Sequence, residues 1–318
     1  MLRVTDEQIA RIRAVPHFAQ GHYAGLDIAA TLEFYCKRYV GPLASFRQID
    51  DETVIADLGT GYGWLAMALV AFTPARVVAV DVDAERLAAG REIAGILGLD
   101  GRIDWHTGRL GNLALADQSA DIVYCIEVLE HVYHDTAALA DLSRIAREVL
   151  IVTTPNKWFP VIAHDTQLPL CHMLPRPLRK LYARLCSRTD HENDNLFWSP
   201  RTLQTGLNDF ERVSRFLHYA SLADYLATYP FYLPYGRGYH ETRPSRTKVA
   251  YYRLAVHLGP WSHIVLPSLA GVWRRARPFK RLPSEHERRG AEARPPRTHK
   301  NRAVSALHLS ADFMDHSR

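Results

Sequence analysis

Residues 54–64 read Val54-Ile-Ala-Asp57-Leu-Gly59-Thr-Gly61-Tyr-Gly63-Trp64 and contain the strongest structural signal in the chain. The apolar first half is typical of a buried strand, and alternating glycines follow it before an apolar helix that begins at Trp64. Glycine accepts positive φ angles and lets a ligand approach the backbone closely. The stretch therefore predicts a strand–turn–helix unit with a ligand site at the turn.

Short apolar runs alternate with amphipathic stretches from about Thr53 to Thr154, as in βαβ units that build a parallel sheet. We expect strands at Thr53–Leu58, Arg76–Asp81, Ile103–His106, Asp121–Ile126 and Glu148–Thr153, with helices at Trp64–Phe72, Asp83–Leu97 and Ala137–Ala146. Ser199-Pro200 is typical of a helix start, and Phe210–Tyr219 and Lys248–Leu258 are predicted to be closing strands.

A second acidic residue, Asp81, ends the strand that follows Asp57. A carboxylate at this place can accept hydrogen bonds from both ribose hydroxyls of a nucleoside. A dinucleotide-binding unit would need another glycine three places after Gly61, where this chain has Trp64. An acid before the glycines suits a cationic ligand better than a pyrophosphate, which disfavours an NAD-dependent oxidoreductase.

These residues resemble the first motif of the class I S-adenosylmethionine-dependent methyltransferases, an acid followed by Gly-x-Gly-x-Gly. Three further stretches, Val80–Asp83, Ser119–Val132 and Leu150–Asn156, resemble the second, fourth and fifth strand regions of that family in the same order. The resemblance implies an α/β fold: a Rossmann-like, doubly wound, mostly parallel seven-stranded sheet with an inserted lid after the fifth strand. It also implies S-adenosylmethionine as the cofactor.

The resemblance assigns the cofactor-binding residues by position. The methionine end would lie among Asp57 and the turn residues, the ribose on Asp81, and the adenine beside Val82, while Glu127 would face the methionine portion or the substrate. The full set of expected cofactor-binding residues is Asp57, Gly59, Thr60, Gly61, Gly63, Asp81, Val82, Arg109, Leu110 and Glu127. Arg109 departs from the family, which often has an Asp there, and a guanidinium offers no acceptor to the adenine amino group.

Two histidines are candidate general bases, for an acceptor that must lose a proton. His131 follows the fourth strand, and the alternative for its Glu-His pair is a helix cap. His164 lies in a Pro- and aromatic-rich stretch from Pro155 to Pro200 that we interpret as a lid over the acceptor, although the same aromatic residues could simply pack with one another. No metal site is expected, since the acidic run Asp190–Asp194 lacks ligand spacing.

The chain divides into five predicted parts. They are an N-terminal helical cover (1–50), a cofactor-binding core (51–156), a substrate lid (157–199), the remainder of the methyltransferase fold (200–273) and a basic tail (274–318) without fixed structure. The N-terminal cover is expected to contain helices at Thr5–Arg13 and Asp27–Val40.

Charge is unevenly distributed along the chain. Lys and Arg total 39 against 34 acids, and Arg274–Arg302 alone carries 11 Lys/Arg and 3 Glu. This run lacks interleaved aromatic residues, so we expect no nucleic acid partner, and only weak contact of the tail with an anionic membrane surface. The N-terminus has no apolar signal core, which leads us to expect a cytoplasmic protein, peripheral to the membrane at most.

The acceptor is expected to be a small molecule or lipid-like, with O-, N- or C-methylation left open. A non-catalytic nucleotide-binding scaffold that keeps the cofactor fold is the alternative from another class. The presence of both Asp57 and Asp81 argues against it.

Overall fold

The computed structural model describes residues 3–20, 25–132, 136–162, 166–188, 197–214, 216–228 and 244–277. These residues belong to one compact unit, Met1–Pro278. His164, the acidic run Asp190–Asp194 and residues 278–318 of the expected tail lie outside the described residues.

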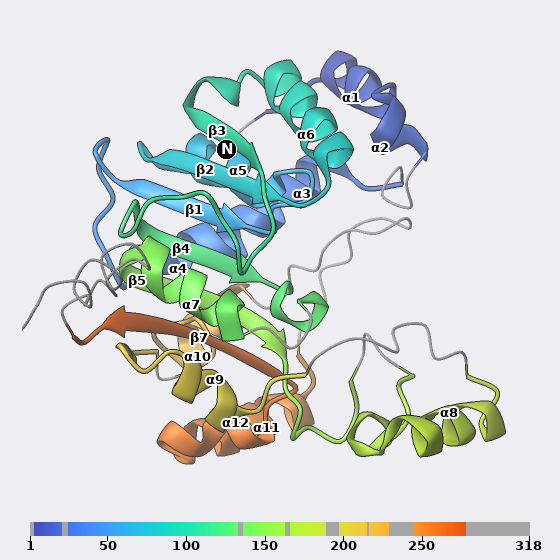
Figure 1. Cartoon of the computed structure of the whole chain (residues 1–318). Helices are drawn as coiled ribbons and strands as arrows, with labels where there is room; N and C mark the ends of the chain where they lie inside the picture. Colours follow the sequence, from blue (N-terminus) through green and yellow to red (C-terminus); the bar gives the residue numbers. More distant parts are fainter. Residues whose placement is uncertain are drawn as a thin grey trace, which may run out of the picture. The chain divides into compact units, whose positions relative to one another are not determined.

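A seven-stranded sheet forms the centre of this unit. Its strands are β1 (Val54–Leu58), β2 (Arg76–Asp81), β3 (Ile103–Thr107), β4 (Ala120–Ile126), β5 (Ala146–Pro155), β6 (Phe210–Arg212) and β7 (Ser268–Arg275). The strand order is β3-β2-β1-β4-β5-β7-β6, and β1 to β5 pair in parallel. β7 is antiparallel to both of its neighbours, so the expected mostly parallel seven-stranded sheet is confirmed (Figure 1).

Helices connect the strands and precede them. The α-helices are α1 (Asp6–Arg13), α2 (Pro16–Gln20), α3 (Ile28–Tyr35), α4 (Gly41–Leu43), α5 (Trp64–Phe72), α6 (Ala84–Leu97), α7 (Thr136–Ile145), α8 (Arg176–Leu185), α9 (Pro200–Gly206), α10 (Leu222–Thr228), α11 (Arg246–His257) and α12 (Ser262–Val265). The shorter helical turns are η1 (Cys36–Val40), η2 (Asp100–Arg102), η3 (Leu129–His131), η4 (Cys171–Met173) and η5 (Gly259–Trp261).

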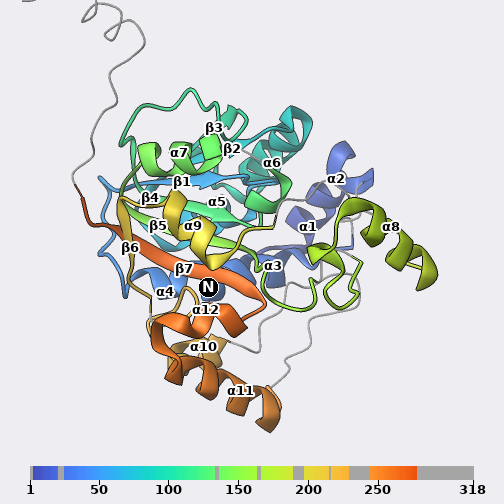
Figure 2. The same ribbon diagram turned by 60° about the horizontal axis from the view of Figure 1, so that its bottom comes forward.

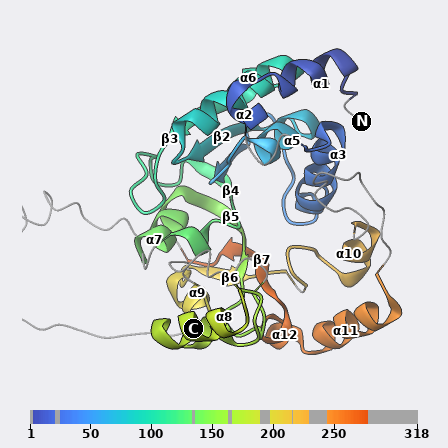
Figure 3. The same cartoon turned by 90° about the vertical axis from the view of Figure 1, so that its right-hand side faces the viewer.

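Helices cover both faces of the sheet, which makes the fold doubly wound. Apolar residues of α1, α3, α5 and α6 form one buried cluster with alternate residues of the strands. Residues of α7 and α9 form a second cluster on the opposite face. Figure 3 shows α1 and α6 at the β3 end of the sheet, with α11 and α12 at the β7 end. The alternation of buried residues along each strand therefore places two separate cores around one sheet.

The end of the sheet differs from the sequence prediction. Lys248–Leu258 was expected to be a strand, but it lies in α11, where the Ser245 hydroxyl accepts a hydrogen bond from the Lys248 amide at 3.2 Å and caps the helix. Only Phe210–Arg212 of the other expected strand pairs in the sheet. The closing strand is β7, in which Leu269–Trp273 are buried on both sides because helices cover both faces.

The basic tail was expected to begin at residue 274, but the packed fold continues beyond that residue. Arg274 and Arg275 belong to β7. The Arg275 guanidinium lies 4.4 Å from the centre of the Phe210 ring, and its Nε donates to the Arg147 carbonyl at 3.0 Å. The Arg274 guanidinium donates to the Phe46 carbonyl at 2.7 Å. These two arginines are therefore part of the packed fold and not of a free tail.

The insertion after β5 contains η4 and α8. Figure 2 shows α8 to one side of the sheet, away from the strands. Among the described residues, no helix is long and apolar enough to cross a membrane.

Candidate cofactor site

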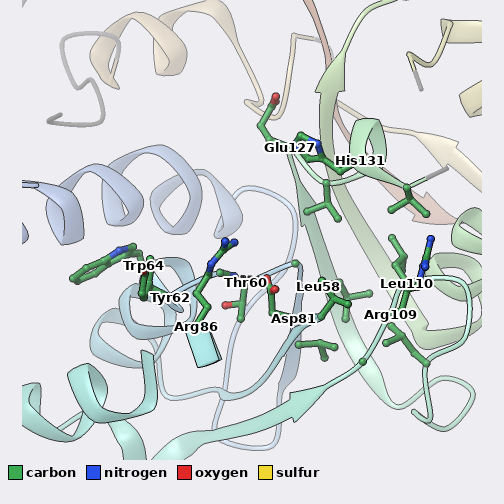
Figure 4. A pocket seen from close by; sticks show the side chains of 18 of the residues that line it. Leu58, Thr60, Tyr62, Trp64, Asp81, Arg86, Arg109, Leu110, Glu127 and His131 are labelled. Atoms are coloured by element: carbon green, nitrogen blue, oxygen red, sulfur yellow. Dashed lines mark hydrogen bonds between the residues drawn. The ribbon is translucent and has the colours of Figure 1, made fainter. Parts of the chain in front are cut away.

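A cavity of about 550 Å³ opens at the carboxyl ends of β1, β2 and β4. Parallel strands of an open α/β sheet place their ligand sites at this edge. Eight of the ten expected cofactor-binding residues line the cavity, namely Gly59, Thr60, Gly61, Asp81, Val82, Arg109, Leu110 and Glu127. Figure 4 shows Thr60 and Asp81 on one side of it and Glu127 and His131 on another.

The glycine turn is held against the end of β2. The amides of Gly59 and Thr60 both donate to the Val80 carbonyl, at 2.7 and 2.9 Å. Gly59, Gly61 and Gly63 have φ angles of 81°, 60° and 77°, which residues with a Cβ rarely adopt. The turn therefore needs glycine at all three positions on backbone grounds alone.

The three glycines differ in what surrounds them. A Cβ on Gly59 would lie 2.2 Å from a methyl carbon of Val128, and a Cβ on Gly63 would lie 2.4 Å from the Trp105 ring. A Cβ on Gly61 would meet only the Arg86 side chain, at 3.8 Å. Gly59 and Gly63 permit close packing, whereas Gly61 borders open space on the cavity.

Asp81 is fixed by the turn that it faces. Its Oδ2 accepts a hydrogen bond from the Gly61 amide at 2.8 Å, and its Oδ1 accepts one from the Asp83 amide at 3.0 Å. Each carboxylate oxygen can accept a further hydrogen bond. Asp81 is thus an oriented acceptor on the cavity wall, as the binding of ribose hydroxyls requires.

Asp57 lies beneath the turn and does not line the cavity. Its Oδ2 accepts a hydrogen bond from the Thr60 hydroxyl at 2.6 Å. Burial raises the pKa of Asp57 to about 7; the Thr60 hydrogen bond opposes this rise, and the nearby Asp81 adds to it. Asp57 thus holds the turn through Thr60. Gly63, the other expected residue outside the lining, packs closely against the Trp105 ring.

The other walls of the cavity come from separate parts of the chain. Leu110 and Leu113 follow β3, and Leu26 and Tyr35 come from the N-terminal helical region. These two N-terminal residues carried no local signal of a site in the sequence. Tyr35 is the last residue of α3, which packs on α5, and Leu26 lies two residues before that helix.

Glu127 is positioned by an unusual backbone conformation. Its φ of 53° is uncommon for a residue with a side chain, and its amide donates to the Thr153 carbonyl at 2.7 Å. The next acid, Glu130, is buried and accepts a hydrogen bond from the Thr154 hydroxyl at 3.0 Å. Burial, reinforced by the Glu127 carboxylate, raises the pKa of Glu130 to about 9. Glu130 is not among the expected site residues, because no pattern around it in the sequence indicates its burial.

The Glu130→Gln variant tests the raised pKa of Glu130 through the free energy of unfolding. An acid whose folded-state pKa is raised above its value in the unfolded chain stabilises less as pH rises, because the unfolded state then releases its proton more easily. The loss begins near the ordinary pKa of 4.5 and continues to about 9. We expect the free energy of unfolding of the variant to equal that of the wild type at pH 5 and to exceed it by at least about 1 kcal/mol at pH 8. Urea unfolding at both pH values measures this free energy. The same difference between variant and wild type at pH 5 and pH 8 would contradict the raised pKa.

His131 lines the cavity at the end of η3 and is exposed to it. Its amide donates to the Val128 carbonyl at 2.9 Å and closes the η3 turn. The next α-helix, α7, begins only at Thr136, so His131 is not part of it. The structure therefore brings one of the two candidate bases to the cavity.

The cavity fits a nucleoside that ends in an amino acid. Open space lies beside Gly61, the Asp81 carboxylate is oriented, and leucine and valine side chains lie near the strand ends. Among the described residues, the buried Nε1 of Trp64 and the buried Nε of Arg86 have no hydrogen-bond partner, and both side chains line the cavity. Such donors suit a carboxylate.

Comparison with protein families supports this interpretation. Residues 55–149 match the model of a methyltransferase domain family. Together with the fold and the cavity, the match defines a domain of the class I S-adenosylmethionine-dependent methyltransferases, whose cofactor is S-adenosylmethionine. A stretch of 119 residues is 31% identical to a probable S-adenosylmethionine-dependent methyltransferase of Mycolicibacterium smegmatis. This match covers 37% of the chain and 43% of that relative, so less than half the length of the relative is spanned.

Solved structures with a similar fold include three methyltransferases. A putative sarcosine dimethylglycine methyltransferase from Galdieria sulphuraria is 14% identical, with a TM-score of 0.47, over 85% of this chain and 98% of that one. Geranyl diphosphate C-methyltransferase from Streptomyces coelicolor is 11% identical, with a TM-score of 0.43, over 74% and 76%. Phosphoethanolamine N-methyltransferase 2 from Haemonchus contortus is 15% identical, with a TM-score of 0.43, over 63% and 44%. None of these similarities bears on the acceptor.

Proposed function

We propose that this protein transfers the methyl group of S-adenosylmethionine to a small-molecule or lipid-like acceptor. The observation that carries the proposal is the Asp81 carboxylate, oriented by the Gly61 amide on the wall of a cavity that Glu127 and His131 also line. The cofactor, when bound, supplies an electrophilic methyl group on a good leaving group. The protein then has mainly to hold the acceptor nucleophile in line with that methyl group.

Each wall of the cavity has a proposed role in this binding. Asp81 accepts hydrogen bonds from the ribose hydroxyls, and Val82 and Leu110 contact the adenine. The Gly59–Gly61 backbone and Glu127 surround the methionine end, while Asp57 acts through Thr60 as a positioning residue. Arg109 is exposed at the adenine side and offers only donors, so the adenine amino group needs another acceptor, such as a backbone carbonyl.

His131 is the proposed base for an acceptor that must lose a proton. Its imidazole is exposed to the cavity that holds the proposed cofactor site. Once an acceptor is identified, His131→Asn is expected to lower turnover and to leave the affinity for S-adenosylhomocysteine unchanged. Unchanged turnover would remove His131 from the mechanism and leave His164 as the other candidate.

A second cavity supports an apolar acceptor. It measures about 890 Å³, and its lining includes Trp158, Leu203, Leu269 and Trp273. Trp158 belongs to the insertion after β5 that we propose to be the acceptor lid. A cavity with such a lining suits the apolar portion of a lipid-like molecule.

The acceptor class can be tested with the methyl group as the label. We expect incubation with radiolabelled S-adenosylmethionine and a total lipid and metabolite extract to give labelled product that is soluble in organic solvent. The Asp81→Ala variant serves as the control for background transfer. Binding of S-adenosylhomocysteine without any labelled product across the extract would favour the non-catalytic scaffold.

A further inference from the structure

The helix α8 turns an apolar stripe toward solvent. Leu178, Leu181 and Leu185 lie at i, i+3 and i+7 on one side of the helix, and their exposed fractions are 52%, 50% and 75%. Arg179 and Ala183 form the opposite, buried side. An amphipathic helix of a globular domain normally packs its apolar stripe on the core. In α8 the apolar stripe faces solvent instead.

Contacts on the inner side of α8 fix this orientation. The Arg179 guanidinium lies 5.9 Å from the centre of the Phe197 ring, and the Cys171 thiol donates to the Arg179 carbonyl at 3.8 Å. Nearby, the His172 Nε2 lies 2.8 Å from the Lys157 carbonyl oxygen. The helix is thus held by the side that carries Arg179 and Ala183, and the leucines remain outside.

Further exposed apolar side chains precede the helix in the chain. Twelve large hydrophobic side chains are exposed among the described residues, and six of them lie between Leu170 and Leu185. We call these six the α8 patch: Leu170, Met173, Leu174, Leu178, Leu181 and Leu185. A concentration of this kind marks an interaction surface.

The formal charge of the described segment that contains the α8 patch is entirely positive. Residues 166–188 contain no Asp or Glu, and their cationic side chains are Arg176, Arg179, Lys180, Arg184 and Arg188. Lys180 and Arg184 are both exposed, and Arg184 follows Leu181 by three residues, on the flank of the leucine stripe. A second copy of the chain would bring two such basic surfaces together, which disfavours self-association.

We propose that the α8 patch docks on an anionic lipid bilayer, with the leucines at the acyl boundary and the flanking cations among the headgroups. An apolar stripe with Lys and Arg beside it is the composition of a helix that lies in the membrane interface. Anionic lipid attracts each basic residue near the surface, so the charges complement the apolar contact. The inference does not depend on the proposed methyl transfer, although it would bring a lipid-like acceptor to the enzyme.

Co-sedimentation of the full chain with vesicles tests the α8 patch. We expect binding to vesicles of equimolar phosphatidylcholine and phosphatidylglycerol and much weaker binding to phosphatidylcholine alone. The triple variant Leu178→Ser, Leu181→Ser, Leu185→Ser is expected to lower the partition coefficient at least about ten-fold. Lys180→Glu with Arg184→Glu is expected to do the same on the anionic vesicles.

Matched variants outside the patch serve as controls. Leu254→Ser removes a leucine that is 61% exposed on α11, and Arg253→Glu reverses an exposed charge on the same helix. Both should bind vesicles like the wild type, and every variant should keep the wild-type melting temperature and S-adenosylhomocysteine affinity.

Three results would overturn the proposal. They are absence of wild-type binding to anionic vesicles, wild-type binding by the triple variant, and a concentration-dependent dimer that the leucine variant abolishes without any vesicle binding. Vesicle binding that survives the loss of the leucines would assign membrane contact to another part of the chain. Because S-adenosylhomocysteine affinity is measured without vesicles, failure of this proposal and failure of the proposed function are distinguishable.

Discussion

Replacing Asp81 with alanine is expected to lower the affinity for S-adenosylhomocysteine by about 1–3 kcal/mol, or roughly five- to 150-fold, through the loss of hydrogen bonds to the ribose. Asp81 is fixed by the Gly61 and Asp83 amides, so it meets the ligand without reorganisation. Calorimetric titration measures the affinity, and thermal melting shows whether the variant folds.

Asp83 provides a matched control for this experiment. It lies two residues away with the same side chain, but it caps α6 by accepting a hydrogen bond from the Arg86 amide at 3.0 Å and does not line the cavity. Asp83→Ala should cost about 1 kcal/mol of stability and leave the affinity unchanged. An equal loss of affinity in both variants would show that the ribose is bound elsewhere.

Alanine at the glycine turn is expected to separate folding from binding. Gly63→Ala adds a Cβ 2.4 Å from the Trp105 ring at a φ of 77°, so both clash and backbone strain oppose folding. We expect it to destabilise the protein by about 2–4 kcal/mol. Gly61→Ala shares the backbone strain without the clash, and should cost only about 1–2 kcal/mol while its methyl group obstructs the cavity.

Gly98→Ala isolates the backbone contribution. Gly98 ends α6 at a φ of 72°, nothing lies within 4 Å of an added Cβ, and it does not line the cavity. We expect Gly98→Ala to lower the free energy of unfolding in urea by as much as Gly61→Ala does. Gly98→Ala should nevertheless bind S-adenosylhomocysteine like the wild type. Equal binding by these two variants would show that the ligand does not approach Gly61.

The cofactor cavity could largely be predicted from the sequence because its parts are local. A strand end, a turn with alternating glycines and an acid at the next strand end are each visible in a few residues. Asp57 shows the limit of this reasoning: its position in the motif suggested a ligand contact, but its hydrogen bond to Thr60 places it behind the turn. Such a difference depends on which way one side chain turns.

Features that depend on distant contacts could not be predicted. The raised pKa of Glu130 arises from burial near β5, which no pattern around residue 130 reveals. The closing strand β7 was missed because its uncharged run beside prolines and glycines has no alternation. The spacing of Leu178, Leu181 and Leu185 is visible in the sequence, but their exposure depends on how Arg179 is held from below.

Titration of the purified full chain with S-adenosylhomocysteine, and with NAD in parallel, determines which nucleotide the cavity binds. We expect one molecule of S-adenosylhomocysteine per chain, binding that Asp81→Ala weakens and Asp83→Ala does not, and no heat with NAD. Binding of NAD alone, or no binding of S-adenosylhomocysteine at millimolar concentration, would contradict the assignment.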